Sequence, residues 1–156
     1  MLSWLWSDPL PSGTPAPDFS LPDESGRIVE LSALRGRNVV LVFYPGDDTT
    51  ICTKQLCQFR DDWKDAEARN VAVFGINPQS DEKHRNFRQK YSFPFPLLVD
   101  KGQHVGALYH TDGFIVKRTV YLIGPDGVIR FSQRGTPSPR EVLESAVKPR
   151  GGSRKA

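Results

Sequence analysis

Two short, almost wholly apolar runs, residues 38–44 and 71–76, constrain the fold of this chain more than any other feature. Both are rich in β-branched residues and short enough for strands, so each predicts a β-strand. Because the apolar residues are continuous rather than alternating, each strand is expected to be covered on both faces of a sheet. The remaining sequence therefore has to supply layers on both sides of that sheet.

Patterns of helical spacing follow both runs and predict those layers. Residues 50–68 read as one helix, and Ser80 is placed to cap a second that ends at residue 91. Further elements are predicted at 27–31 (strand), 94–99 (strand), 103–109 (short helix), 117–131 (hairpin around a Gly-Pro-Asp-Gly turn) and 139–147 (helix). We therefore expect an α/β fold with a mixed central sheet flanked by helices. The element order is that of a thioredoxin-like fold with an N-terminal hairpin extension.

Length and charge indicate one such domain, preceded by an irregular arm and followed by a basic tail. A chain of 156 residues with 38% apolar residues forms a single core. We expect an irregular arm at 1–12, the domain at 13–147 and a flexible basic tail at 148–156. The tail holds four basic residues and no acidic one, so residues 1–147 carry 17 basic and 18 acidic side chains. Such a body lacks the basic surplus of a nucleic-acid-binding protein.

The location and assembly of the protein are predicted from what the sequence lacks. No apolar run approaches the roughly 18–20 residues of a membrane span, and residues 1–8 do not resemble a secretory signal. We therefore expect a cytoplasmic protein with reduced thiols and no membrane partner. A monomer is expected, with Trp4 and Trp6 in the arm as the residues that would support a dimer.

Two cysteines are too few for a disulfide scaffold, so they are either structural thiols or reactive ones. Cys52 comes after a buried strand and a turn, at the start of the helix predicted over 50–68. Its sulfur would lie among unpaired backbone N–H groups at the positive end of the helix dipole, and both favour the thiolate. A thiolate is the species that attacks peroxides and disulfides.

The two cysteines lie on different faces of this predicted helix. At about 100° per residue, Cys52 shares an apolar stripe with Leu56, Phe59, Trp63 and Ala66. Cys57 lies about 140° from Cys52, with Cα atoms about 8–9 Å apart, beyond the roughly 7 Å limit for a disulfide. A bond between them would require at least one turn to unwind, which makes the pair a candidate redox switch. The alternative is that Cys57 is a half-buried packing residue.

The segment Pro45-Gly-Asp-Asp-Thr-Thr-Ile-Cys52 resembles the active site of the peroxiredoxins, specifically the bacterioferritin-comigratory or peroxiredoxin Q group. Pro45, Thr49 and Cys52 match the pattern Pro-x-x-x-Thr-x-x-Cys. Cys57 matches the resolving cysteine five residues later and is followed by the family's Phe-Arg-Asp. Arg118 aligns with the active-site arginine, and the resemblance covers about residues 13–147.

This resemblance implies an antioxidant thiol peroxidase for hydrogen peroxide and organic hydroperoxides that needs no metal, flavin or haem. Cys52 would be the peroxidatic nucleophile and become a sulfenic acid. Thr49 would hydrogen-bond the thiolate or peroxide, Arg118 would supply positive charge, and Pro45 would shield the sulfur. Cys57 would then form an intramolecular disulfide that a thioredoxin-type reductant cleaves.

The sequence departs from the family pattern at Thr50 and Ile51, where Pro and Gly are common. Both residues are β-branched and stiffen the segment; Ile51 would narrow the peroxide entrance or change how readily the helix unwinds. Two alternatives stay open. One is a one-cysteine peroxidase resolved by an external thiol, and the other is a non-catalytic holdase or binding module on the same scaffold.

Other polar residues are given ordinary roles. His84, His104 and His110 show no metal-ligand spacing with the cysteines. His84 lies on an apolar helical face, which favours a packing histidine. Asp47 and Asp48 are interpreted as turn and solvent-facing groups rather than as acid–base catalysts, because turns favour Asp.

Overall fold

The computed structural model describes residues 8–148, and its core is one five-stranded sheet with the strand order β5-β4-β3-β6-β7. The strands are β3 (Asn38–Phe43), β4 (Val71–Asn77), β5 (Leu97–Val99), β6 (Thr119–Ile123) and β7 (Ile129–Arg134). Strand β4 pairs in parallel with β3 and β5, whereas β6 pairs antiparallel with β3 and β7. The mixed sheet expected from the sequence is therefore confirmed.

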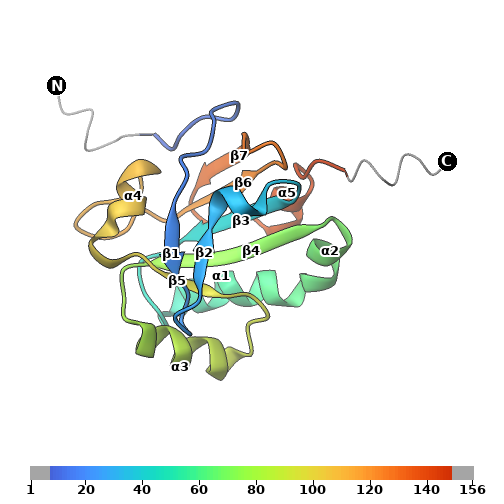
Figure 1. Cartoon of the computed structure of the whole chain (residues 1–156). Helices are drawn as coiled ribbons and strands as arrows, with labels where there is room; N and C mark the ends of the chain where they lie inside the picture. Colours follow the sequence, from blue (N-terminus) through green and yellow to red (C-terminus); the bar gives the residue numbers. More distant parts are fainter. Residues whose placement is uncertain (1–7, 149–156) are drawn as a thin grey trace.

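A second, two-stranded sheet precedes the main one. Strands β1 (Ser20–Pro22) and β2 (Ile28–Glu30) pair antiparallel, and the short 3-10 helix η2 (Leu31–Leu34) follows. In Figure 1 this hairpin, drawn in blue, crosses in front of the main sheet. It is the N-terminal hairpin extension that the sequence predicted.

Side chains of the central strands alternate between two apolar clusters, one on each face of the sheet. Every residue of β3 and β4 is buried. Val40 and Val42 belong to one cluster, whereas Val39 and Leu41 belong to the other. A sheet buried on both faces was the expectation from the two continuous apolar runs, and it is confirmed.

The helices cover these faces unequally (Figure 1). They are α1 (Thr50–Asp61), α2 (Trp63–Ala68), α3 (Asp81–Tyr91), η3 (Lys101–Gln103), α4 (His104–Leu108) and α5 (Pro139–Leu143). Helices α1, α2, α3 and α5 contribute buried residues to the first cluster. The hairpin, η2 and α4 contribute to the second. As predicted, Ser80 caps α3, accepting a hydrogen bond from the Lys83 backbone N–H at 3.2 Å.

The prediction of a single helix over 50–68 is wrong, because the chain breaks at Asp62. This residue has φ −99° and ψ 20°, so α1 ends at Asp61 and α2 begins at Trp63. Aspartate is a poor residue for a helix interior because its side chain competes for backbone groups. Two adjacent carboxylates at the C-terminal end of α1 also oppose the helix dipole. The last predicted helix is likewise shorter, since α5 ends at Leu143.

The described part of the N-terminal arm, residues 8–12, has no helix or strand and lies against the body. The Leu10 N–H donates to the Tyr121 hydroxyl at 2.9 Å, and the Gly13 N–H donates to the Ile129 carbonyl at 2.7 Å. Trp4, Trp6 and the tail after Lys148 lie outside the described residues. No helix in the described part of the chain has the length and apolar character needed to cross a membrane.

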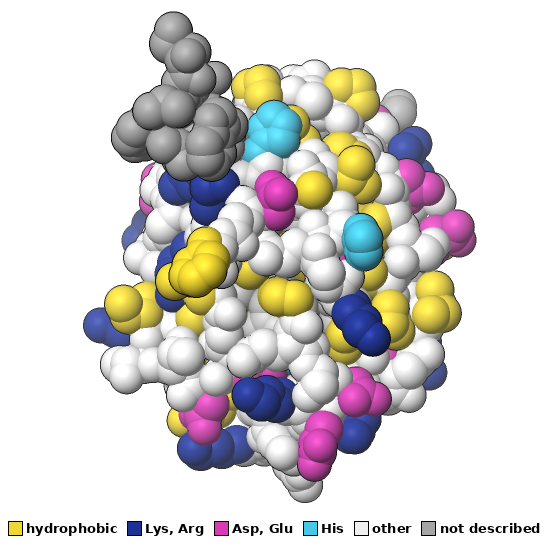
Figure 2. All heavy atoms as spheres, turned by 90° about the vertical axis from the view of Figure 1, so that its left-hand side faces the viewer, with side chains coloured by type: hydrophobic (Ala, Val, Ile, Leu, Met, Phe, Trp, Pro, Cys, Tyr) yellow, Lys and Arg dark blue, Asp and Glu magenta, His cyan; other side chains and the backbone are white. Residues whose placement is uncertain are grey.

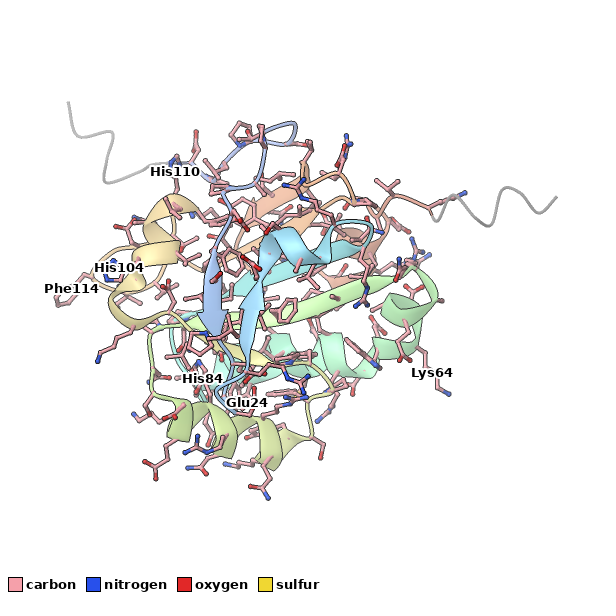
Figure 3. The ribbon with its side chains drawn as sticks, viewed as in Figure 1. Glu24, Lys64, His84, His104, His110 and Phe114 are labelled. Carbon is pink, nitrogen blue, oxygen red and sulfur yellow. The ribbon has the colours of Figure 1, made fainter. Side chains whose placement is uncertain are left out.

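On the surface, charged side chains of both signs are interspersed. Figure 2 shows one face on which basic and acidic groups alternate with scattered hydrophobic ones. The loop after α4 carries the most exposed apolar side chains, Phe114 and Ile115. Phe114 points away from the body (Figure 3).

Candidate functional site

The connection from β3 to α1, residues 44–49, places Cys52 in the first turn of a helix. Thr49 is the N-cap residue in an extended conformation, with φ −90° and ψ 156°. Its hydroxyl donates to the Gly46 carbonyl at 3.2 Å and makes no capping hydrogen bond to the helix. The first-turn N–H groups have no partner within the helix, and Cys52 belongs to this same turn. Thr49 itself is exposed and Pro45 is half-buried.

The Cys52 side chain is fully buried, in the apolar cluster between α1 and the sheet. Leu56, Phe59 and Ala66 are buried in the same cluster, and Trp63 packs against it. The apolar stripe predicted for this segment is thus confirmed, even though the helix breaks within it. The sulfur is shielded from bulk water, so an oxidant reaches it only by entering this cluster or when α1 opens.

Cys57 lies on the same helix but at the edge of the cluster, where it is half-buried. Both cysteines are free thiols in this structure. Burial raises the pKa of the Cys57 thiol, and the nearby Arg60 guanidinium opposes that shift. Cys57 is therefore held as the neutral thiol, whereas Cys52 lies at the end of the helix that stabilises negative charge.

A buried hydroxyl lies directly after Cys52. The Oγ1 atom of Thr53 has no hydrogen-bond partner within residues 8–148. Most buried side-chain polar atoms in native proteins do have a partner. The first turn of α1 therefore contains a polar group that its folded surroundings do not satisfy.

Arg118 reaches the cysteine-bearing helix through Gln55. Arg118 lies just before β6 and is half-buried, and its carbonyl accepts from the Gly135 N–H at 2.8 Å. Its guanidinium Nη1 donates to Oε1 of Gln55 at 3.0 Å, and Nε2 of Gln55 donates to the Gly135 carbonyl at 3.4 Å. Gln55 is buried, three residues after Cys52. Sequence reasoning missed it, although a glutamine one turn from the cysteine and beside the apolar stripe was a usable signal.

The interpretation of Asp47 as a solvent-facing group is wrong. Its side chain is only 4% exposed. Oδ1 accepts from the Tyr44 hydroxyl at 2.6 Å and from Asn77 Nδ2 at 3.1 Å, and Oδ2 lies 2.5 Å from Nδ1 of His84. Sequence reasoning missed this cluster because its members are brought together by the sheet and not by spacing along the chain.

Asp48, in contrast, is exposed as expected. It accepts from Lys90 Nζ at 2.8 Å and from the Tyr91 hydroxyl at 2.9 Å, both on the last turn of α3. One aspartate of the turn is therefore anchored inside the molecule, and the next is anchored on its surface.

Tyr44 connects the buried aspartate to the cysteine. Its ring is fully buried in the same cluster as Cys52. Burial, followed by the negative charge of Asp47, raises the pKa of Tyr44 well above its ordinary value, and Cys52 adds a smaller contribution in the same direction. Tyr44 therefore stays protonated and remains a hydrogen-bond donor.

The three histidines do not form a common site. His84 is buried as predicted, whereas His104 and His110 lie at the α4 end of the molecule (Figure 3). Within residues 8–148, no group of three or more His, Cys, Asp and Glu side chains is placed to hold a metal ion.

Comparison with known proteins gives a consistent set of relatives. The AhpC/TSA family profile matches residues 12–132. The chain is 41% identical over 126 residues to a putative peroxiredoxin bcp of Coxiella burnetii, covering 75% of this chain and 83% of that one. It is 36% identical over 140 residues to a chloroplastic peroxiredoxin Q of Oryza sativa subsp. japonica. That match covers 87% of this chain but only 64% of the rice protein.

Solved structures agree with the fold. The structure superposes on the peroxidoxin BcpB of Mycobacterium tuberculosis with a TM-score of 0.81 and 31% identity, covering 86% of this chain and 94% of that one. A peroxiredoxin Q of Xanthomonas campestris gives a TM-score of 0.77 at 23% identity, covering 81% and 88% of the two chains. These similarities confirm the thioredoxin-like fold expected from the element order.

Proposed function

Because this chain belongs to the AhpC/TSA family, the peroxiredoxins, which reduce peroxides with a cysteine thiol, we propose that Cys52 is its peroxidatic nucleophile and Cys57 its resolving thiol. The substrates are hydrogen peroxide and organic hydroperoxides. A thioredoxin-type dithiol returns the enzyme to its reduced form.

The first step is a displacement at oxygen. The Cys52 thiolate attacks one peroxide oxygen, the O–O bond breaks, and the leaving alkoxide or hydroxide takes up a proton to give alcohol or water. Cys52 is oxidised to a sulfenic acid and the peroxide is reduced. First-turn N–H groups and Arg118 stabilise the negative charge on sulfur and on the leaving oxygen, Thr49 hydrogen-bonds the thiolate or peroxide, and Pro45 shields the sulfur from water.

The second step is resolution. Cys57 sulfur attacks the Cys52 sulfenic sulfur, a disulfide forms, and the sulfenic hydroxyl leaves as water with the thiol proton. Because both residues lie on α1, the helix has to unwind between them before the sulfur atoms can meet. The reductant then transfers two electrons and two protons to the disulfide, and α1 re-forms.

One observation carries this proposal. A single helix holds a fully buried cysteine in its uncapped first turn and, five residues later, a half-buried cysteine held as the neutral thiol. Arg118 contacts that helix through Gln55, between the two cysteines. Two cysteines that only fill space in the core would not require one sulfur at a helix N-terminus, a second one at the cluster edge and an arginine held between them.

Intact mass after one equivalent of hydrogen peroxide tests the scheme. The wild-type chain should lose two hydrogens, Cys57→Ser should gain one oxygen, and Cys52→Ser should remain unchanged. A wild-type chain that gains one oxygen would indicate a one-cysteine enzyme resolved by an external thiol. No mass change, together with suppression of client aggregation that survives removal of both thiols, would indicate a binding module.

The reductant is tested by coupled turnover. NADPH consumption with thioredoxin and thioredoxin reductase should be sustained in the presence of peroxide, and it should stop in Cys57→Ser after at most one turnover. Glutathione with glutaredoxin is the comparison, and faster turnover with that pair would exclude thioredoxin as the preferred reductant.

A further inference from the structure

We propose that Asp47 and His84 form a buried positioning pair that fixes the segment from Pro45 to Thr49 in the geometry in which Cys52 reacts with peroxide. Neither residue contacts the reacting atoms in this scheme; they act through the backbone of the segment. The inference rests on the proposed function of Cys52 and goes beyond it by assigning a role to two residues outside the cysteine motif.

Both carboxylate oxygens and the backbone N–H of Asp47 have hydrogen-bond partners. Its two carboxylate oxygens accept hydrogen bonds from Tyr44 and Asn77 and contact His84. Its own N–H donates to Oε1 of Gln79 at 2.5 Å. Since Gln79 N–H donates in turn to Oδ1 of Asn77 at 2.8 Å, the turn before α1 is tied to the turn between β4 and α3.

His84 joins that turn to β5, an edge strand of the sheet. Its side chain is fully buried, and Nε2 lies 2.9 Å from the Leu98 carbonyl on β5. A carbonyl only accepts hydrogen bonds, so Nε2 carries a proton. One further proton lies between Nδ1 and Oδ2 of Asp47, on either atom, and in both arrangements the pair is neutral overall. A neutral, fully hydrogen-bonded pair can be buried at little cost.

We call Asp47, His84 and their hydrogen-bond partners the anchor. Helix α3, which carries His84, is itself fixed to the rest of the molecule at a second point. Glu24, in the turn of the N-terminal hairpin, accepts from Arg88 Nη1 at 2.5 Å and from the Leu97 N–H at 3.0 Å. Figure 3 shows Glu24 and His84 both between the sheet and α3. Because these contacts hold α3 in place, Asp47 can move only if its hydrogen bond to His84 breaks.

The turn needs such an anchor because it is strained. Asp48 adopts φ +58°, in the left-handed region that non-glycine residues occupy at a cost. The chain reverses there between β3 and α1, so a change at Asp47 moves Thr49 and the first turn of α1. Tyr44 donates a hydrogen bond to Asp47 and is buried in the same apolar cluster as Cys52. Tyr44 therefore links the anchor to the surroundings of the reacting sulfur.

Two rates, measured in a Cys57→Ser background so that only Cys52 reacts, separate positioning from general damage. One is Cys52 oxidation by hydrogen peroxide, and the other is Cys52 alkylation by iodoacetamide. Both reagents need access to the buried sulfur, but only peroxide also needs the arranged segment. The ratio of the two rate constants is the readout, because a change in access to the sulfur affects both reactions, and a destabilised control variant shows how far destabilisation alone changes the ratio.

Asp47→Ala should lower this ratio at least tenfold, and His84→Phe, which keeps a ring but loses both hydrogen bonds, should do the same. The double variant should lose little more than either single one, because the residues act as a unit. Asp47→Asn should stay within threefold of the parent, since an amide still accepts from Tyr44 and can donate to neutral His84. A loss in Asp47→Asn as large as in Asp47→Ala would overturn the hydrogen-bonding role.

Asp100→Ala is the matched control, because Asp100 is a buried aspartate that accepts from the N–H groups of Val105 and Gly106 at 3.0 and 2.8 Å. Val105 belongs to the apolar cluster that does not contain Cys52. It should lower the melting temperature and leave the ratio unchanged. If Asp47→Ala does not fold, Gln79→Ala removes one hydrogen bond of the anchor and should lower the ratio about threefold. A parent that does not react with peroxide refutes the proposed function; a reactive parent with unchanged ratios in all anchor variants refutes only the anchor.

Discussion

Arg118 donates a hydrogen bond from its guanidinium to the side-chain oxygen of Gln55, at 3.0 Å, in the middle of the segment that separates the two cysteines. The arginine that the family pattern assigns to charge stabilisation is therefore attached to the helix that would unwind in the proposed resolution step. In the proposed scheme, opening of α1 would separate Gln55 from Arg118, and the charge that Arg118 is proposed to supply would move away from the oxidised sulfur.

We expect Arg118→Ala to lower the rate of Cys52 oxidation by peroxide about 100-fold or more, which is typical for loss of one donor that stabilises a developing oxyanion. Gln55→Ala should lower it less, about tenfold, because the guanidinium remains but is no longer held. Gln55→Glu keeps an acceptor but places a negative charge against the guanidinium, so it should lower the rate at least as much as Gln55→Ala. Quenched-flow mass spectrometry measures all three, and an unchanged rate in Arg118→Ala would remove this residue from the site.

A pair of substitutions at Ile51 separates entrance size from helix stability. Ile51 is 59% exposed in the first turn of α1. Both Ile51→Ala and Ile51→Gly remove the branched side chain, but alanine favours the helix and glycine disfavours it, by about 0.5 kcal/mol each relative to isoleucine. If unwinding limits disulfide formation, glycine should speed it and alanine slow it, each about twofold. Changes of the same sign in both variants would point to the entrance instead.

The last turn of α3 holds α1 at both of its ends. Asp48 accepts from Lys90 and Tyr91 before the helix begins, and Arg60 Nη1 donates to the Tyr91 carbonyl at 2.7 Å near its end. We expect Asp48→Ala to accelerate disulfide formation and to reduce overoxidation of Cys52 to the sulfinic acid at high peroxide. Asp81→Ala, which removes an exposed ion pair with Arg85 on the first turn of α3, is the control and should change neither.

The pKa shifts of Asp48 and Lys90 set the pH range over which the contact between Asp48 and the last turn of α3 persists. Hydrogen bonds from Lys90 and Tyr91 lower the pKa of Asp48, so its contribution is present above the ordinary value near 4 and is lost as pH falls through the lowered pKa. The same contact raises the pKa of Lys90, so that contribution is lost only as pH rises through a value above about 10.4. The effect of Asp48→Ala on disulfide formation should therefore be constant between pH 5 and 9. A marked change within that range would show that another group controls opening.

The sequence predicted the elements whose signal is local. The runs at 38–44 and 71–76 became β3 and β4, and the apolar stripe of Cys52, Leu56 and Phe59 faces the core as its spacing required. The break at Asp62 was missed, because apolar spacing continues across it and only the local chemistry of two aspartates interrupts the helix.

The polar parts of the site were harder to predict because their partners are distant in sequence. Asp47 and His84 are 37 residues apart. Asp47 follows β3 and His84 follows β4, so only the pairing of these two strands brings the residues together. Gln55 and Arg118 are 63 residues apart and meet across α1 and β6. A hydrophobic period shows which face is buried, but it does not show which polar groups meet there.

The hydroxyl of Thr53 bears on the energetics of turnover. A buried polar group without a partner costs about 1–3 kcal/mol, and water would satisfy it as soon as the first turn of α1 opens. In the proposed cycle, opening of that turn lets this hydroxyl bond to water, which favours the open helix and with it the disulfide.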